Sequence, residues 1–206
     1  MRCEETARWL SVPAALIYGV EPDRAIAALA ESQYGLVTRA QAVSRGLSEA
    51  GFDRRVASGN WTRVHRGVYR LTGSPQTPEQ SVKAACLAIP GALASHRAAA
   101  AILGLPEIQP RVEITVLQSR RIRLEAVQVH RTTRLETVDR DFEKGIPVTS
   151  LARTMIDLCG VLAKDQMASA LDHVLAKRRV PGRRAATERK VTTEWAGDRL
   201  SVGAAS

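Results

Sequence analysis

Thr38–Leu71 reads TRAQAVSRGLSEAGFDRRVASGNWTRVHRGVYRL, and this stretch decides the fold that we expect. A helix begins after Thr38, because Gln41 follows three residues later and each side chain can bond the other residue's free backbone N–H. Gly46 ends this helix, and Ser48 caps a second one. The order of short helix, tight turn and second helix predicts a helix-turn-helix.

A β-hairpin is expected after the second helix. Trp61–His65 and Val68–Leu71 read as two short strands. Arg66 and Gly67 supply the turn between them, because glycine accepts a positive φ. With a preceding amphipathic helix over 24–33, the hairpin predicts a winged helix-turn-helix.

The charge of this stretch indicates a polyanionic partner. Thr38–Leu71 holds seven arginines against two acids, an excess of five positive charges over 34 residues. The whole chain carries a net charge of +9 and has a pI of about 10.2. A cationic surface of this kind fits phosphates, so we expect double-stranded DNA as the partner.

The second helix is expected to lie in the major groove. Phe52 and Val56, at i and i+4, form its core face, and Arg54 points to the opposite side with Arg55 at the edge. An arginine there can bond guanine O6 and N7 together, so Arg54 and Arg55 are the expected base readers. The small residues Ala50 and Gly51 are interpreted as allowing close approach to DNA.

Other residues are expected to contact the DNA backbone or to pack in the core of the domain. Thr38 and Ser48 stand at the N-termini of helices, which favour bound phosphate, so their hydroxyl groups are expected to contact DNA phosphates. Trp61 is interpreted as a core anchor rather than an exposed stacking residue. The complete set of expected DNA contacts is Thr38, Arg39, Ser48, Arg54, Arg55, Ser58, Arg63, His65, Arg66 and Arg70.

The predicted fold class is α+β, in which the winged helix-turn-helix precedes a mixed α/β domain with a small sheet. Helices are expected after Thr77 and Ser95, and alternating apolar residues predict half-buried strands near 112–116 and 127–130. Two further helices follow Ser150 and Asp165. The expected divisions are an arm over 1–23, the DNA-binding domain over 24–73, the α/β domain over 77–180 and a basic, disordered tail over 181–206.

Nothing in the sequence indicates an enzyme, a metal site or a cofactor. The four histidines, His65, His96, His130 and His173, lack metal-ligand spacing, and there is no nucleophile elbow or phosphate-binding loop. The three cysteines lack the spacing of a disulfide framework or a zinc site. Cys86 and Cys159 are therefore expected to be buried thiols, and the chain is expected in a reducing cytoplasm. The apolar run over 9–20 is too short to cross a membrane.

The ordered residues resemble the AbiEi antitoxin family over about 24–180. The resemblance is carried by five segments, namely Gly35-Leu36-Val37-Thr38, Ser58-Gly59-Asn60-Trp61, His65-Arg66-Gly67-Val68-Tyr69, Ser95-His96-Arg97-Ala98-Ala99-Ala100 with Gly104-Leu105, and Gly145-Ile146-Pro147-Val148-Thr149-Ser150 through Arg153-Thr154 to Asp157-Leu158.

This resemblance implies the antitoxin of a bacterial type IV toxin–antitoxin pair. Family members bind their own promoter through the winged helix and repress it, and the second domain counteracts a nucleotidyltransferase-like toxin without a stable complex. Longer relatives continue into a nuclease-like domain that residues after Val180 do not match. A basic interaction module without antitoxin activity, or the remnant of a longer endonuclease-like protein, is the alternative.

Overall fold

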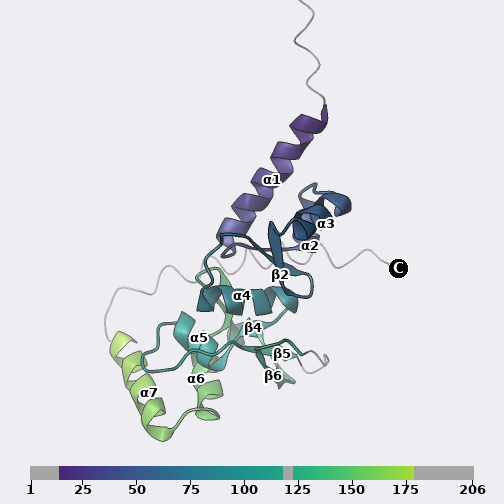
Figure 1. Ribbon diagram of the computed structural model, residues 1–206. Coiled ribbons are helices and arrows are strands. Elements are labelled where there is room, and N and C mark those ends of the chain that lie inside the picture. The colour runs from purple at the N-terminus through teal and green to yellow at the C-terminus, as the bar shows by residue number, and fades with distance from the viewer. Residues whose placement is uncertain (1–13, 118–122, 179–206) are drawn as a thin grey trace, which may run out of the picture. The chain divides into compact units, whose positions relative to one another are not determined.

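The computed structural model describes residues 14–117 and 123–178, and the chain divides into two compact units, 1–75 and 76–206 (Figure 1). Both units combine helices with a small sheet, which confirms the mixed α+β class. The predicted tail over 181–206 and the first part of the predicted arm lie outside the described residues.

Unit 1 contains three helices and a three-stranded antiparallel sheet among its described residues. In chain order its elements are α1 (Ala14–Ser32), β1 (Leu36–Thr38), α2 (Arg39–Ser44), α3 (Glu49–Ala57), β2 (Trp61–His65) and β3 (Val68–Leu71). The sheet order is β1-β3-β2. The two hairpin strands are confirmed at the predicted bounds, and Gly67 in their turn has a φ of +78°.

Two features of unit 1 differ from the sequence expectation. Helix α1 begins at Ala14, ten residues before the predicted start at Arg24. Strand β1 is not predicted from the sequence, because three residues are too few for a periodic pattern. It pairs with β3 and ends at Thr38, the residue that caps α2.

The core of unit 1 gathers around Phe52, whose side chain is fully buried. Trp61 and Tyr69 both meet its ring edge-on, at centroid distances of 5.0 and 4.8 Å. Edge-to-face contact is a favoured aromatic geometry. Trp61 is therefore confirmed as a core residue, and it joins the hairpin to α3.

The described part of unit 2 is built on a five-stranded mixed sheet with the order β6-β5-β4-β8-β7. In chain order its elements are α4 (Pro78–Ala88), β4 (Leu93–Ala94), α5 (His96–Ile102), β5 (Glu113–Leu117), β6 (Gln128–Thr132), a 3-10 turn η1 (Thr137–Asp139), β7 (Arg140–Glu143), β8 (Ile146–Thr149), α6 (Leu151–Cys159) and α7 (Lys164–Arg178). Helix α4 packs on β4, β5 and β8, whereas α5 packs on β5 and α6.

Strand β5 is buried on both faces, so the expectation of a half-buried strand is wrong. Glu113 and Thr115 are as inaccessible as Ile114 and Val116, which alternate with them. The reason is that β5 lies inside the sheet, between β6 and β4, and α5 packs against it. A carboxylate on this strand therefore needs partners inside the protein.

Among the described helices, none combines the length and the apolar character that crossing a membrane requires.

Candidate nucleic-acid interface

The two helices of the predicted helix-turn-helix are both capped by hydroxyl side chains. Thr38 Oγ1 accepts from the N–H of Gln41 at 3.1 Å, and Gln41 Oε1 accepts from the N–H of Thr38 at 2.9 Å, which confirms the capping box. Ser48 Oγ accepts from the N–H of Gly51 at 3.1 Å. Each hydroxyl still has its own proton to donate, which allows a phosphate contact.

Helix α3 has one buried face and one exposed face. Phe52 is fully buried and Val56 packs beside it, as the i, i+4 spacing predicts. Ala50, Arg54 and Ala57 are exposed. Within the described part of the chain, Arg54 makes no ion pair. The exposed face of α3 therefore offers one arginine flanked by small side chains.

Gly51 does not belong to this exposed face, so the interpretation of its size is wrong. The residue is buried, and a Cβ added there would lie 3.0 Å from Ser48 Oγ and 3.1 Å from Leu47 Cδ1. Gly51 therefore lets α3 pack closely on the preceding turn, and its small size provides no room for DNA.

Arg55 already has partners within unit 1. Its Nη2 donates to Oδ1 and Oδ2 of Asp23 at 2.5 and 2.7 Å, and its Nη1 donates to the carbonyl of Gly51 at 2.9 Å. The guanidinium carbon lies 5.9 Å from the ring centroid of Trp61. These contacts tie α3 to α1, so any contact of Arg55 with a base would first have to break them.

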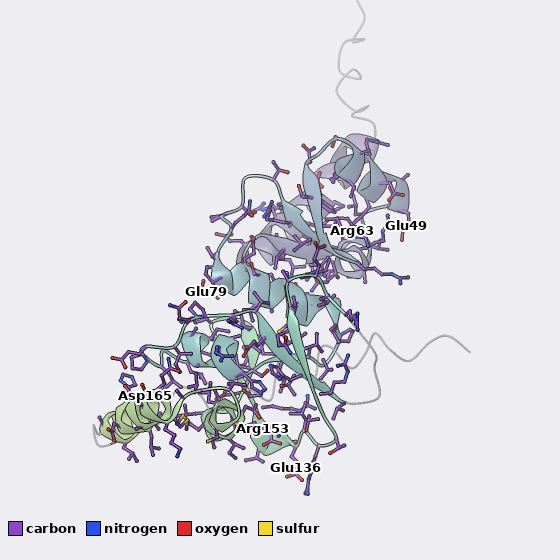
Figure 2. The ribbon with its side chains drawn as sticks, turned by 60° about the horizontal axis from the view of Figure 1, so that its bottom comes forward. Glu49, Arg63, Glu79, Glu136, Arg153 and Asp165 are labelled. Carbon is purple, nitrogen blue, oxygen red and sulfur yellow. The ribbon has the colours of Figure 1, made fainter. Side chains whose placement is uncertain are left out.

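Arg39 is held in a similar way at the start of α2. Its guanidinium pairs with Glu49 and Asp53 on α3, and its Cζ lies 4.3 Å from the centroid of the Phe52 ring. These contacts fix α2 against α3. The acids also reduce the positive charge that this side of α3 presents; Figure 2 labels Glu49 at the helix start.

The remaining predicted contacts lie on the hairpin and at the end of α3. Arg63 is exposed on β2 (Figure 2), and Arg66 is exposed in the turn. His65 and Arg70 are partly buried on the strands. Ser58 follows α3, where its hydroxyl donates to the carbonyl of Arg55 at 3.2 Å. Arg63 and Arg66, like Arg54, form no ion pair in the described part of the chain.

Unit 2 contains a buried ion pair that the sequence did not indicate. Glu113 Oε1 accepts from Arg97 Nη1 at 3.0 Å, and Glu113 Oε2 accepts from the backbone N–H of Arg97 at 2.9 Å. Arg97 Nη2 also donates to the carbonyl of Val161 at 2.6 Å. Glu113 therefore caps α5 from β5. Ser95, the expected cap, makes no side-chain capping bond there.

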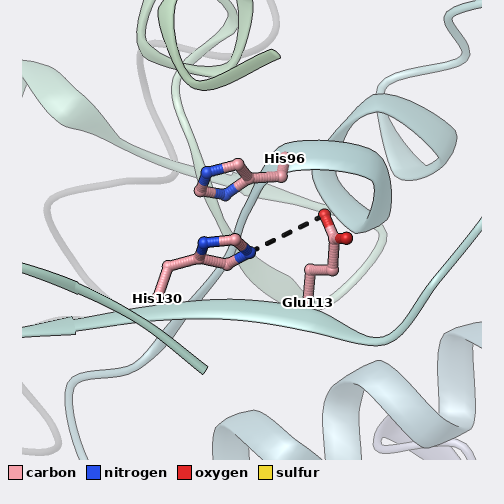
Figure 3. Close-up of side chains that lie close together, drawn as sticks. All are labelled: His96, Glu113 and His130. Carbon is pink, nitrogen blue, oxygen red and sulfur yellow. Dashed lines mark ion pairs between the residues drawn. The ribbon is translucent and has the colours of Figure 1, made fainter. Parts of the chain in front are cut away.

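Two of the histidines that look scattered in the sequence are stacked beside this pair. The rings of His96 and His130 lie 3.5 Å apart between centroids with an interplanar angle of 14° (Figure 3). Burial lowers the pKa of both imidazoles, and in His96 the neighbouring His130 lowers the pKa further. Both rings are therefore neutral at neutral pH.

The sequence alone could predict only part of the cluster that His96, Glu113 and His130 form. Glu113 and His130 occupy polar positions in two alternating segments, and these segments pair in parallel, with Thr115 opposite His130. Glu113 and His130 thus share one face of the sheet. His96 comes from a different element, and only the tertiary fold places it there.

Other polar expectations in unit 2 have mixed outcomes. Arg153 Nε donates to Asp157 Oδ1 at 2.8 Å across one turn of α6, and both side chains are largely buried. Cys86 is buried as expected, and burial raises the pKa of its thiol to about 12. Cys159 is exposed, so the expectation that it is buried is wrong.

Comparison with solved structures finds similarity over most of the chain. The crystal structure of the RV2827C protein from Mycobacterium tuberculosis is 13% identical in sequence, with a TM-score of 0.46. The similarity covers 74% of this chain and 71% of that chain. No curated protein matches the chain.

The family comparison concerns unit 1. Residues 24–72 match the family model described as "Transcriptional regulator, AbiEi antitoxin". The matched stretch contains most of α1 and every later element of unit 1. The match supports the AbiEi-type antitoxin family, which this description calls a transcriptional regulator.

Proposed function

We propose that this chain is a DNA-binding antitoxin that represses its own promoter in a bacterial type IV toxin–antitoxin system. In this proposal, residues 24–73 form a winged helix-turn-helix, in which α3 enters the major groove and the β2–β3 hairpin is the wing. Residues 77–180 form the domain that counteracts a nucleotidyltransferase-like toxin without a stable complex. The chain acts in the cytoplasm.

The observation that carries the DNA-binding proposal is the exposed face of α3. Arg54 projects from the side opposite Phe52, with Ala50 and Ala57 beside it. The element order helix, strand, helix, helix, hairpin supports the winged arrangement, because a recognition helix and a wing then come from adjacent segments. The family match over 24–72 supports the regulatory role.

The ion pairs of unit 1 divide its arginines between two roles. Arg39 and Arg55 hold α2, α3 and α1 together, so they fix the angle at which α3 meets DNA. Arg54 is the base reader in this proposal. Arg63 and Arg66 contact the phosphate backbone, where an exposed charge contributes affinity without sequence preference. Thr38 and Ser48 donate their hydroxyl protons to phosphates at the helix starts.

Removing the guanidinium of Arg54 should reduce the preference for the operator. We expect Arg54→Ala to weaken binding to the upstream DNA of its own gene by about 5- to 150-fold, the equivalent of about 1–3 kcal/mol for one bidentate base contact. Binding to scrambled DNA should fall much less. Gel-shift titrations on both duplexes at one salt concentration measure the two losses.

The matched control for this variant is Arg54→Lys. Lysine keeps the positive charge but lacks the planar fork that bonds O6 and N7 together. It should therefore retain binding to scrambled DNA and lose most of the preference for the operator. Equal losses on both duplexes for Arg54→Ala would remove this residue from the base-reading role.

Arg66 tests the wing. Arg66→Ala should weaken operator and scrambled duplexes alike, because a phosphate contact carries no base information. The slope of log binding constant against log salt concentration should become shallower by about 0.9, the value for one released counterion. Titrations over a series of salt concentrations measure this slope. An unchanged slope would place Arg66 away from the phosphates.

A further inference from the structure

Three side chains that can bind a metal ion meet inside unit 2, and the proposed DNA contacts of unit 1 do not involve them. His96 begins α5, Glu113 begins β5 and His130 lies on β6 (Figure 3). One donor atom of each residue lies within 4.8 Å of the other two. We propose that His96, Glu113 and His130 bind one Zn²⁺ ion.

The first support is an unsatisfied buried nitrogen. His130 Nε2 is inaccessible to solvent and has no hydrogen-bond partner among the residues that the structure describes. Buried polar atoms are almost always bonded, so an atom of this kind points to a missing ligand. The nitrogen faces Glu113 Oε2 at 4.0 Å (Figure 3), too far for a hydrogen bond.

The spacing of these two atoms fits a bridging ion. Zn–N bonds measure about 2.0–2.1 Å and Zn–O bonds about 2.0–2.2 Å, so the two bonds together span about 4.1 Å. The observed 4.0 Å corresponds to a nearly linear N–Zn–O arrangement, so Nε2 and Oε2 must approach each other by about 0.6 Å to form a tetrahedral site. Two imidazoles and one carboxylate favour zinc over magnesium or calcium, which prefer oxygen ligands.

The neighbours of the three ligands suit metal binding. Arg97 holds the Glu113 carboxylate through Nη1 and its backbone N–H, as outer partners of metal ligands do, and Oε2 retains a further lone pair. Asp157 Oδ2 is also buried, has no hydrogen-bond partner within residues 14–117 and 123–178, and adds negative charge near both rings.

Zinc binding must break the histidine stack. An imidazole donates its lone pair in the plane of the ring, and two rings stacked at 3.5 Å cannot both aim at one ion. One ring therefore rotates when the ion binds. If His96 is the ring that rotates, it loses a polar contact, because its Nδ1 lies 3.0 Å from Ser95 Oγ. This rotation gives the site a signature that can be observed by NMR.

The test uses the full chain, stripped with EDTA, freed of chelator and titrated with ZnCl₂ by calorimetry. We expect one bound ion per chain and a higher thermal midpoint in its presence. Co²⁺ in place of zinc should give the visible absorption of a tetrahedral site without the near-ultraviolet band of a thiolate ligand. Zinc should shift the ring-proton resonances of His96 and His130 and leave those of His65 and His173 unchanged.

The variants decide whether the named residues hold the ion. His130→Ala should weaken zinc binding by about 100-fold or more, because even an outer partner of a ligand is worth about 10- to 100-fold. His173→Ala is the matched control, since its Nε2 is also buried without a partner but lies outside the cluster. Cys159→Ser is a second control, because its exposed thiol is an alternative zinc ligand. Both controls should bind as the unsubstituted chain does.

Three results would overturn the proposal. They are a folded chain that takes up no zinc, zinc binding that survives His130→Ala, and a thiolate band with Co²⁺ that Cys159→Ser removes. If circular dichroism shows that His130→Ala does not fold, His130→Leu replaces it, because leucine fills similar space without a donor atom. Loss of zinc binding in folded His130→Leu supports the site, and retention overturns it.

Discussion

Arg97→Ala should destabilise unit 2 by about 3–5 kcal/mol, the range for breaking a buried ion pair by removing one partner. The Glu113 carboxylate, 2% exposed, would keep its bond from the backbone N–H of residue 97 but lose the guanidinium that neutralises it. The carbonyl of Val161 would lose its donor as well. An uncompensated buried charge makes this loss larger than that of any exposed ion pair.

Urea unfolding of the full chain, followed by circular dichroism, measures this change in free energy. Arg134→Ala is the matched control, because Arg134 pairs with Glu136 in the same unit but its side chain is 80% exposed. Its loss should lie between about 0 and 1 kcal/mol. Adding Glu113→Gln to Arg97→Ala should restore part of the stability, since the unpaired charge is then gone. Equal effects for Arg97→Ala and Arg134→Ala would contradict the account of unit 2.

Phe52→Ala should destabilise unit 1 by about 3–5 kcal/mol, the range for large aromatic-to-alanine changes in a core. The ring is fully buried, meets Trp61 and Tyr69 edge-on, and supports the guanidinium of Arg39. Its removal leaves a cavity between α3 and the hairpin.

The fluorescence of Trp61 reports the unfolding of unit 1, provided that Trp9 and Trp195 are first replaced by phenylalanine. Val43→Ala and Val64→Ala serve as controls, because both valines are exposed, and each should change the free energy of unfolding by less than about 0.5 kcal/mol. Phe52→Ala should also abolish DNA binding at temperatures at which unit 1 of this variant is unfolded. A loss for Phe52→Ala no greater than that of the valine variants would show that the aromatic cluster does not stabilise unit 1.

The elements of unit 1 that local signals define could be predicted from the sequence. The caps at Thr38 and Ser48, the hairpin strands and the burial of Trp61 all follow from residue types a few positions apart. The packing role of Gly51 could not be predicted in this way. The spacing of Phe52 and Val56 predicts the rotation of α3, but the burial of Gly51 depends on how the preceding turn folds, with Ser48 Oγ and Leu47 Cδ1 at 3.0 and 3.1 Å from an added Cβ.

The sheet of unit 2 was predicted only in part, because its strands are short or polar. Strand β4 has two residues, β7 reads RDFE, and β8 contains Pro147, which argues against a strand in the interior of a sheet. Without these strands, β5 looks like an edge strand with a solvent face. The full sheet instead buries Glu113, and this burial explains both its pairing with Arg97 and its position beside His130.

The partners of Arg39 and Arg55 are a further property that a linear sequence does not fix. Asp23 lies 32 residues from Arg55, and Glu49 and Asp53 reach Arg39 only because α2 and α3 cross closely. Counting arginines therefore overstates the charge available to DNA. Ion pairs within the unit leave Arg54 as the arginine of α3 without a carboxylate partner among the described residues.

A guanine-substitution scan tests most directly whether Arg54 reads a base in the major groove. Each guanine of the upstream binding site is replaced in turn by 7-deazaguanine, which removes the N7 acceptor and keeps base pairing. We expect at least one position where the substitution weakens binding of the unsubstituted chain by about 5-fold or more and has no effect on Arg54→Ala. If every position affects both proteins equally, or none affects either, α3 does not read DNA through Arg54.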